Sequence, residues 1–173
     1  RHVTSITKSN AQGYGMVLWD RVFREVSGEY PDVSTASLLV DAAAMDFVRR
    51  PGAFDVVVAS NLFGDILSDL SAMVTGSIGL APSANLDPSR KSPSLFEPVH
   101  GSAPDIAGKG VANPMATVLA AAMMMEHLGE VEVAAALEAA VRDALASAAV
   151  LTRDLGGAAT TAETAAELMR RIN

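Results

Sequence analysis

The chain has 173 residues, which is long enough for one sizeable hydrophobic core or for parts of two domains. Its formal net charge is −7 and no basic run exceeds two residues, which argues against binding to nucleic acid or to an anionic membrane. There is no cysteine, so disulfides and zinc–thiolate sites are excluded, and no apolar run reaches transmembrane length. Because the start also lacks a signal-peptide pattern, we expect a cytoplasmic protein.

Strand-like and helix-like segments alternate through the first half of the chain. A continuous run of apolar residues at 56–59 is typical of a strand buried on both faces, and apolar residues recur at helical spacing between Val17 and Val26. This alternation predicts an α/β fold with parallel or mixed strand pairing. The expected elements are strands at 3–7, 37–40 and 56–59 and helices at 12–26, 41–50 and 61–73.

From Gly76 to Pro114 the sequence is rich in Gly, Pro, Ser and Asn and contains only brief apolar runs. A loop of this length inside a compact domain is usually functional, so we expect this segment to contribute to a binding site. Two helices are expected beyond it, at 115–128 and at 130–149. Thr160 and Glu163 have the spacing of a capping box, which predicts the start of a last helix.

The segment Asn61-Leu62-Phe63-Gly64-Asp65-Ile66-Leu67-Ser68-Asp69 carries two acids at helical spacing. Asp65 and Asp69 are four residues apart, so their carboxylates lie on one face of a helix and repel each other. A shared cation would relieve that repulsion, but two solvated acids would also explain the spacing. Spacing alone leaves the choice open.

Two other polar clusters follow predicted strands, which is where α/β folds place their chemistry. Lys8-Ser9-Asn10 follows the first strand, and Asp41 stands between the second strand and its helix. The alternatives to functional roles are a surface lysine and an aspartate that caps the helix.

A third cluster is the run Glu-Pro-Val-His-Gly-Ser-Ala-Pro-Asp-Ile-Ala-Gly-Lys-Gly-Val-Ala-Asn-Pro at 97–114. It is not a P-loop, because Gly108-Lys109 lacks the following Ser or Thr, and the chain contains no Gly-x-Gly-x-x-Gly. Any dinucleotide site here is therefore not the usual Rossmann one. The glycines and prolines fix the backbone, and the side chains that offer polar contacts are His100, Ser102, Asp105 and Asn113.

Together these clusters resemble the C-terminal half of the β-decarboxylating dehydrogenases, the family of isocitrate, isopropylmalate, tartrate and D-malate dehydrogenases. Residues 61–69 resemble the family's metal-binding helix, and the run from His100 to Asn113 resembles its adenosine-binding loop. The resemblance covers essentially the whole chain. It implies an α/β fold of the isocitrate/isopropylmalate dehydrogenase type, with mixed sheets and flanking helices, lacking the N-terminal half.

The resemblance also implies a domain organisation. Residues 1–75 would complete the smaller substrate and dimerisation domain, which includes the metal-binding helix. Residues 76–173 would return to the larger cofactor-binding domain. The helices at 41–50 and 64–73 would form a four-helix bundle between the two subunits of a homodimer.

Individual side chains receive roles by the same resemblance. Asp65 and Asp69 would bind Mg²⁺ or Mn²⁺ together with Asp41 contributed across the dimer interface, since hard cations prefer carboxylate oxygens. Lys8, acting across the same interface, would take the proton of the substrate hydroxyl, so that Lys8 and Asp41 are the expected catalytic residues. Asn10 would contact the substrate or the nicotinamide.

The resemblance implies NAD rather than NADP as the cofactor. Asp105 matches the position that hydrogen-bonds the adenosine ribose, where a carboxylate accepts from a 2′-hydroxyl and repels a 2′-phosphate. His100 would lie near the adenine, and small residues at 101 and 103 would let the backbone approach it. The expected cofactor-binding residues are Asn10, His100, Gly101, Ser102, Ala103, Asp105 and Asn113.

The implied reaction is the NAD- and metal-dependent oxidation of a small 2-hydroxy dicarboxylate, with or without decarboxylation, by a homodimer with shared active sites. Ala11 stands where isopropylmalate dehydrogenases typically carry a valine against the isopropyl group, which favours tartrate or D-malate. The alternatives are a fragment of a 3-isopropylmalate dehydrogenase, a non-catalytic subunit and a dimerisation module. The family's substrate-binding arginines and catalytic tyrosine lie upstream of Arg1, so we expect the chain to be part of a longer enzyme and inactive alone.

Overall fold

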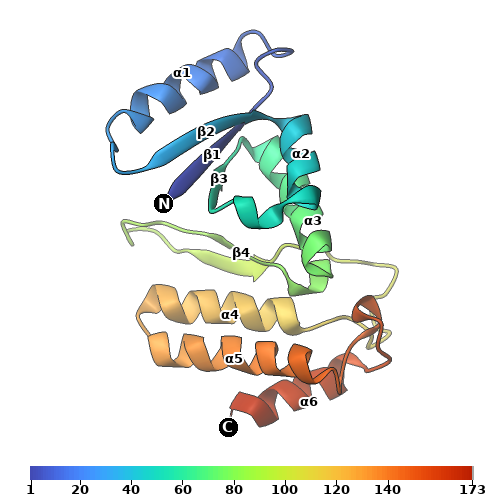
Figure 1. The fold of residues 1–173 in the computed structure, drawn as a ribbon. Helices are drawn as coiled ribbons and strands as arrows, with labels where there is room; N and C mark the ends of the chain where they lie inside the picture. Colours follow the sequence, from blue (N-terminus) through green and yellow to red (C-terminus); the bar gives the residue numbers. More distant parts are fainter. Residues whose placement is uncertain (173) are drawn as a thin grey trace. The chain divides into compact units, whose positions relative to one another are not determined.

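The computed structural model describes residues 1–172, which form two compact units (Figure 1). The first unit is Arg1–Val74, and the second begins at Thr75. Strands and helices alternate in the first unit, while three helices and a short hairpin make up most of the second, which confirms the predicted α/β class. The assignment of the units to a dimerisation domain and a cofactor-binding domain remains a prediction.

A three-stranded parallel sheet forms the centre of the first unit. β1 (His2–Thr7) lies between β2 (Ser34–Leu39) and β3 (Val56–Val58) and pairs in parallel with both. β2 begins earlier than predicted, because its polar first residues pair with β1 although they show no apolar pattern. The carboxyl ends of all three strands therefore lie at one edge of the sheet.

The pleat of β1 places neighbouring side chains on opposite faces of the sheet. Ser5 accepts a hydrogen bond at 2.9 Å from Trp19 Nε1 of α1 (Gly15–Ser27). Ile6 is fully buried and packs on the other face, against α2 (Val40–Arg49) and α3 (Asn61–Thr75). α1 therefore covers one face of the sheet, and α2 and α3 cover the other (Figure 1). The buried residues around Ile6 are Ala43, Phe47, Phe63 and Leu67.

α1 differs from its prediction in where it begins and in what it buries. It was predicted from residue 12 but begins at Gly15, after a turn closed on the carbonyl of Lys8. The helical spacing of apolar residues correctly predicted a helix here. It did not show that the apolar stripe of this helix lies outside the core of the unit. The residues of that stripe, each about half exposed, are Val17, Leu18, Val22 and Val26.

α2 ends where the sequence predicts. Pro51 has no N–H to continue the helix, and it begins the 3₁₀ helix η1 (Pro51–Ala53) instead. Asp46 pairs with Arg49 at 2.9 Å and with Arg50 at 2.6 Å. These ion pairs join the last turn of α2 to the residue that follows it.

The second unit contains a hairpin where the sequence predicts only loop. β4 (Pro82–Asn85) pairs antiparallel with β5 (Leu95–Pro98), after the 3₁₀ helix η2 (Ile78–Leu80). Strands this short, each with a proline at one end, carry too little apolar alternation to be recognised. The connection is ordered by Asp87, whose carboxylate accepts hydrogen bonds from the backbone N–H groups of Ser89, Lys91 and Ser92.

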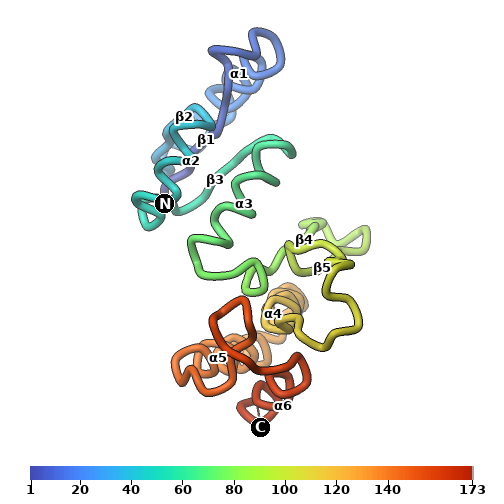
Figure 2. The backbone as a smooth tube through the Cα atoms, turned by 90° about the vertical axis from the view of Figure 1, so that its right-hand side faces the viewer, coloured from blue at the N-terminus to red at the C-terminus, as the bar shows by residue number. Residues whose placement is uncertain are grey.

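Three helices complete the second unit, and their course can be followed in Figure 2. α4 (Met115–Leu128) packs against the hairpin and against α5 (Val131–Ser147), and α6 (Thr161–Ile172) packs against α5. The 3₁₀ helix η3 (Arg153–Leu155) stands between α5 and α6 in the sequence. Their shared core consists of Met115, Val141, Ala144 and Leu168.

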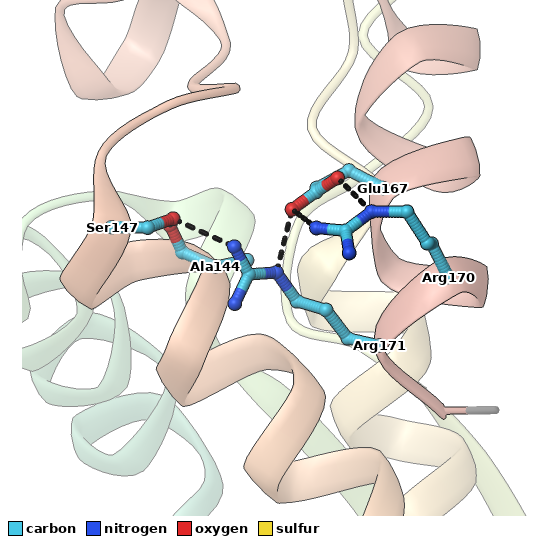
Figure 3. A network of polar contacts seen from close by, with 5 residues as sticks. All are labelled: Ala144, Ser147, Glu167, Arg170 and Arg171. Atoms are coloured by element: carbon cyan, nitrogen blue, oxygen red, sulfur yellow. Dashed lines mark hydrogen bonds and ion pairs between the residues drawn. The ribbon is translucent and has the colours of Figure 1, made fainter.

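A hydrogen bond from Arg171 joins α6 to the end of α5, and ion pairs within α6 hold that arginine in place (Figure 3). Glu167 accepts hydrogen bonds from Arg170 Nη2 and Arg171 Nε, both at 2.7 Å. Arg171 also donates to Ser147 Oγ at 2.9 Å, and Ser147 donates to Ala144 O. The Arg170 guanidinium, assisted by that of Arg171, holds the pKa of Glu167 below its usual range.

Thr160→Ala should lower the free energy of unfolding by about 1 kcal/mol, because it removes the N-cap of α6. The predicted capping box is present: Thr160 N donates to Glu163 Oε2 at 2.8 Å, and Glu163 N donates to Thr160 Oγ1 at 3.2 Å. Urea denaturation measures the loss. Thr117→Ala, at an exposed position inside α4, is the control and should be neutral or slightly stabilising. Equal losses in the two variants would contradict the capping role.

Candidate functional site

The carboxyl edge of the sheet brings the two predicted catalytic residues together. Lys8 follows β1, and Asp41 lies in the first turn of α2, directly after β2. Lys8 Nζ donates a hydrogen bond to Asp41 Oδ1 within an ion pair. This hydrogen bond holds the pKa of the Asp41 carboxyl below its usual range. The two side chains are 26% and 59% exposed, so both remain accessible to a ligand.

The turn after β1 displays further polar groups beyond the sheet edge. The backbone N–H groups of Ala11 and Gln12 donate to Lys8 O at 2.9 and 2.8 Å, which closes the turn. Asn10 and Ala11 are both exposed on it. The role of Asn10 at the substrate or the nicotinamide remains a prediction.

Asp65 and Asp69 lie on α3, which follows the third strand of the same sheet. Both are exposed, whereas Phe63 and Leu67 of the same helix are buried in the core. Across residues 1–172, no three acidic or histidine side chains converge closely enough to hold a metal ion. Asp41 therefore does not complete a site with them inside one chain. The predicted site, in which Asp41 comes from a second subunit, stays a prediction.

The chemistry of these donors fits the predicted metal. Mg²⁺ and Mn²⁺ prefer carboxylate and water oxygens, and the chain has no cysteine that would favour zinc. The exposed carboxylates of Asp65 and Asp69 stand one helical turn apart on α3. The oxygen atoms of such a carboxylate pair could coordinate a divalent cation.

A cavity of about 760 Å³ lies within the second unit. Its volume is in the range of small-molecule sites. The loop at 100–113 forms most of the wall, with contributions from η2, η3 and the start of α6. Of the predicted cofactor-binding residues, it brings together His100, Gly101, Ser102, Ala103 and Asn113.

The loop around this cavity is held by its own turns and by α6. Ala103 and Gly110 take positive φ angles of +41° and +65°. Thr161 of α6 donates from its backbone N to Gly110 O at 2.9 Å and from Oγ1 to Ala112 O at 2.6 Å. These contacts anchor the end of the loop to a helix, so the wall of the cavity is shaped by the fold.

Two predicted cofactor residues are placed differently. Asp105 is an exposed residue of the same loop and is not part of the cavity wall as the structure describes it. Asn10 belongs to the first unit. Their contacts with a cofactor remain predictions.

The cavity wall also contains residues that sequence reasoning missed. Asp154, in η3, accepts hydrogen bonds from Ser77, Asn113 and Thr152. Partial burial raises the pKa of Asp154, but hydrogen bonds from these three side chains outweigh it and hold the pKa below its usual range. Thr152 is two residues from Asp154, but Ser77 and Asn113 are 77 and 41 residues away, and no spacing pattern connects them, so no local signal identified this cluster.

The lowered pKa of Asp154 predicts a pH dependence of stability. A carboxyl with a lower pKa in the folded state stabilises the fold above its unfolded value of roughly 3.9 and loses that contribution as the pH falls through the native value. The difference in melting temperature between the native chain and Asp154→Asn should therefore be constant near neutral pH and shrink below about pH 4. Asp143→Asn, at an exposed position of α5, should show no such convergence. A difference independent of pH would contradict this assignment.

The parallel sheet, with Lys8 and Asp41 at its carboxyl edge, places the chain among the α/β proteins. The second unit adds a cavity lined by a loop. The sequence model of the isocitrate/isopropylmalate dehydrogenase family matches residues 1–170, and the chain belongs to this family. In the part of the chain that the structure describes, no helix is both long and apolar enough to cross a membrane.

The curated relatives that the chain resembles are named as two different enzymes. The chain is 52% identical over 171 residues to a probable tartrate dehydrogenase/decarboxylase of Bacillus subtilis, covering 99% of this chain and 48% of the relative. It is 56% identical over 149 residues to a 3-isopropylmalate dehydrogenase of Frankia casuarinae, covering 86% and 44%. The chain thus spans about half the length of the curated relatives it matches.

Solved structures confirm the predicted fold type. The crystal structure of isocitrate dehydrogenase from Methylococcus capsulatus aligns with a TM-score of 0.94 at 43% sequence identity. The alignment covers 99% of this chain and 50% of that one. The resemblance found in the motifs therefore extends to the arrangement of the backbone.

Proposed function

We propose that this chain supplies the adenosine pocket and the metal ligands of an NAD- and Mg²⁺- or Mn²⁺-dependent dehydrogenase. It acts as part of a longer enzyme on a small 2-hydroxy dicarboxylate. The observation that carries the proposal is the cavity of the second unit, whose wall contains five of the seven residues expected at the cofactor.

The composition of the cavity wall supports a nucleotide as its occupant. Apolar side chains of Ile78, Ile106 and Val111 stand beside the polar groups of His100 and Asn113. An apolar lining with a few placed polar groups suits a purine ring attached to a ribose. Asp105, exposed on the same loop, would accept hydrogen bonds from the ribose hydroxyls.

The first unit supplies the proton-transfer chemistry. Lys8 Nζ, in its neutral amine form, would take the proton of the substrate hydroxyl, and Asp41 Oδ1 would orient that amine through the contact between them. A metal held by Asp41, Asp65 and Asp69 would stabilise negative charge on the substrate oxygens. NAD would accept the hydride from the substrate carbon.

We propose that α2 and α3 join two copies of the chain. They expose large apolar side chains, and an exposed apolar surface of this kind marks a site of protein–protein contact. Pairing these faces would bring Lys8 and Asp41 of one copy towards Asp65 and Asp69 of the other. The most exposed of these apolar residues are Met45, Val48, Leu62, Ile66 and Met73.

The same exposed face favours a second candidate function, a dimerisation module without catalysis. Light scattering, which measures dimer formation, combined with a Mn²⁺ titration followed by electron paramagnetic resonance, which measures metal binding, separates the two functions. Saturable Mn²⁺ binding by a dimer supports the enzyme. A dimer that binds no Mn²⁺ supports the module.

NAD should bind more tightly than NADP, and Asp105→Asn should narrow that preference by roughly tenfold, because the carboxylate repels a 2′-phosphate. Isothermal titration calorimetry of both cofactors against the native chain and the variant measures the effect. Asp143→Asn, with the same change of charge on α5, is the matched control and should leave the preference unchanged. Tighter binding of NADP, or no binding of either, would contradict the proposed cofactor site.

The substrate is the remaining part of the proposal. Ala11 leaves a small wall on the turn beside Lys8, which supports tartrate or D-malate over isopropylmalate. The 173-residue chain alone should oxidise neither with NAD and Mn²⁺. Turnover by the chain alone would contradict its being part of a longer enzyme. A preference of that longer enzyme for isopropylmalate would contradict the substrate assignment.

A further inference from the structure

Three segments of the cavity wall meet at one carboxylate. Asp154 Oδ2 accepts hydrogen bonds from Ser77 Oγ at 2.5 Å and from Asn113 Nδ2 at 3.0 Å, and Oδ1 accepts from Thr152 Oγ1 at 2.5 Å. Ser77 is 2% exposed, Thr152 0% and Asn113 8%. Three buried donors therefore converge on Asp154, and each would lose its partner without it.

The Asn113 amide has only one orientation that satisfies its neighbours. Asn113 Oδ1 accepts from the backbone N–H of Met115 at 3.0 Å, at the first residue of α4. Its Nδ2 then faces the Asp154 carboxylate, which can only accept. A flipped amide would set its nitrogen against the N–H of Met115 and its oxygen against the carboxylate. The side chain is thus fixed between α4 and η3.

The turn at Ser77 is part of the same assembly. Ser77 Oγ accepts from Gly79 N at 2.9 Å while it donates to Asp154. A Cβ at Gly79 would lie 2.8 Å from Asn113 Cβ and 3.0 Å from Asp154 Oδ2. The backbone at residue 79 therefore lies directly against the Asn113–Asp154 pair, with no room for a side chain.

We propose that Asp154 is a positioning residue, which fixes the Asn113 amide in the geometry that accepts the adenosine end of the cofactor. This inference rests on the proposed function, in which the cavity binds NAD. Both carboxylate oxygens of Asp154 accept hydrogen bonds from protein donors, and the proposal is that Asp154 acts through Asn113, whose side chain lines the same cavity.

Asp154→Asn tests the inference with almost no change of shape. The asparagine side chain has one acceptor oxygen where aspartate has two, and its other group is an NH₂ donor. That NH₂ group must lie against a neighbour that now donates to Asp154, so either two donors face each other or a hydroxyl has to accept instead of donate. We expect NAD affinity, measured by calorimetry, to fall roughly tenfold while the circular dichroism spectrum stays native. Asp143→Asn should bind NAD as the native chain does. Native affinity in Asp154→Asn would overturn the proposal.

A double-mutant cycle shows whether Asp154 acts through Asn113. If it does, adding Asp154→Asn to Asn113→Ala should weaken NAD binding no further than Asn113→Ala alone. Losses of affinity that multiply in the double variant would overturn the positioning role. A merely structural contribution by Asp154 would also weaken binding in the Asn113→Ala background.

The side-chain amide resonances of Asn113 give a readout that needs no ligand. In the native chain they should shift in a pH titration as Asp154 takes up its proton, and the shift should be absent in Asp154→Asn. Resonances that ignore both pH and the substitution would overturn the positioning role. If the native chain binds no NAD, the proposed function fails, and these resonances alone decide whether Asp154 positions Asn113.

Discussion

Asp65→Asn should lower the affinity of the protein for Mn²⁺ by about 100-fold. Loss of a carboxylate removes both a ligand and a negative charge from a hard-cation site, and even partners of metal ligands are worth 10- to about 100-fold. Asp65 is exposed on α3 with Asp69 one turn further along. The substitution should therefore leave folding unchanged. Titration of Mn²⁺, followed by its electron paramagnetic resonance signal, measures the affinity directly.

Asp32→Asn is the matched control for this prediction. Asp32 is exposed in the turn before β2 and carries the same charge in the same unit. Its substitution should change Mn²⁺ affinity little, because a distant exposed charge is screened by salt. Equal losses in the two variants would mean that Mn²⁺ responds to the overall negative charge, and the assignment of Asp65 as a ligand would be wrong.

Gly157→Ala should destabilise the second unit by about 3 kcal/mol or more, because the added methyl group meets backbone atoms that cannot move aside. A Cβ at this position would lie 1.9 Å from Leu151 O and 2.5 Å from Leu151 C. Leu151 O also accepts a hydrogen bond from Ala159 N at 2.9 Å. Relief of the clash therefore requires opening the segment that carries Asp154. Urea denaturation measures the loss, and NAD affinity should fall with it.

Gly52→Ala is the control for the steric argument. A Cβ at Gly52 would meet nothing within 4 Å, so this substitution should change the free energy of unfolding by less than about 1 kcal/mol. A similar stability for Gly157→Ala would show that the close approach of residues 151 and 157 is not needed for folding.

Periodicity in the sequence was enough to predict most of the helices and the parallel strands. The β-branched run around Val57 and the helical spacing of α5 are local patterns that report local structure. The β4–β5 hairpin was missed because its pairing, Ser83 with Glu97, depends on a partner across the loop and not on either short strand. The opposite happens in α1, where apolar residues recur clearly at helical spacing but none of them is buried.

The residues of the candidate site likewise fall into those that the sequence predicted and one that it did not. The loop from His100 to Asn113 was found because its chemistry is contiguous in the sequence, and most of its predicted residues line one cavity. Lys8 and Asp41 were chosen separately, and strand order brings them into an ion pair. Asp154 was not predicted, because its role is defined by partners that only the folded second unit assembles.

The central claim is that the cavity beside the 100–113 loop binds NAD, and mapping the bound cofactor by NMR tests it most directly. The second unit offers a competing cavity of about 730 Å³ between residues 148 and 170. Titration of NAD into the ¹⁵N-labelled chain should shift the backbone amides of Gly101, Ser102, Ala103 and Asn113 and leave those of the competing cavity unchanged. Shifts confined to residues that line only the competing cavity, such as Ala149, Ala159 and Ala166, or no saturable shift at all, would contradict the account.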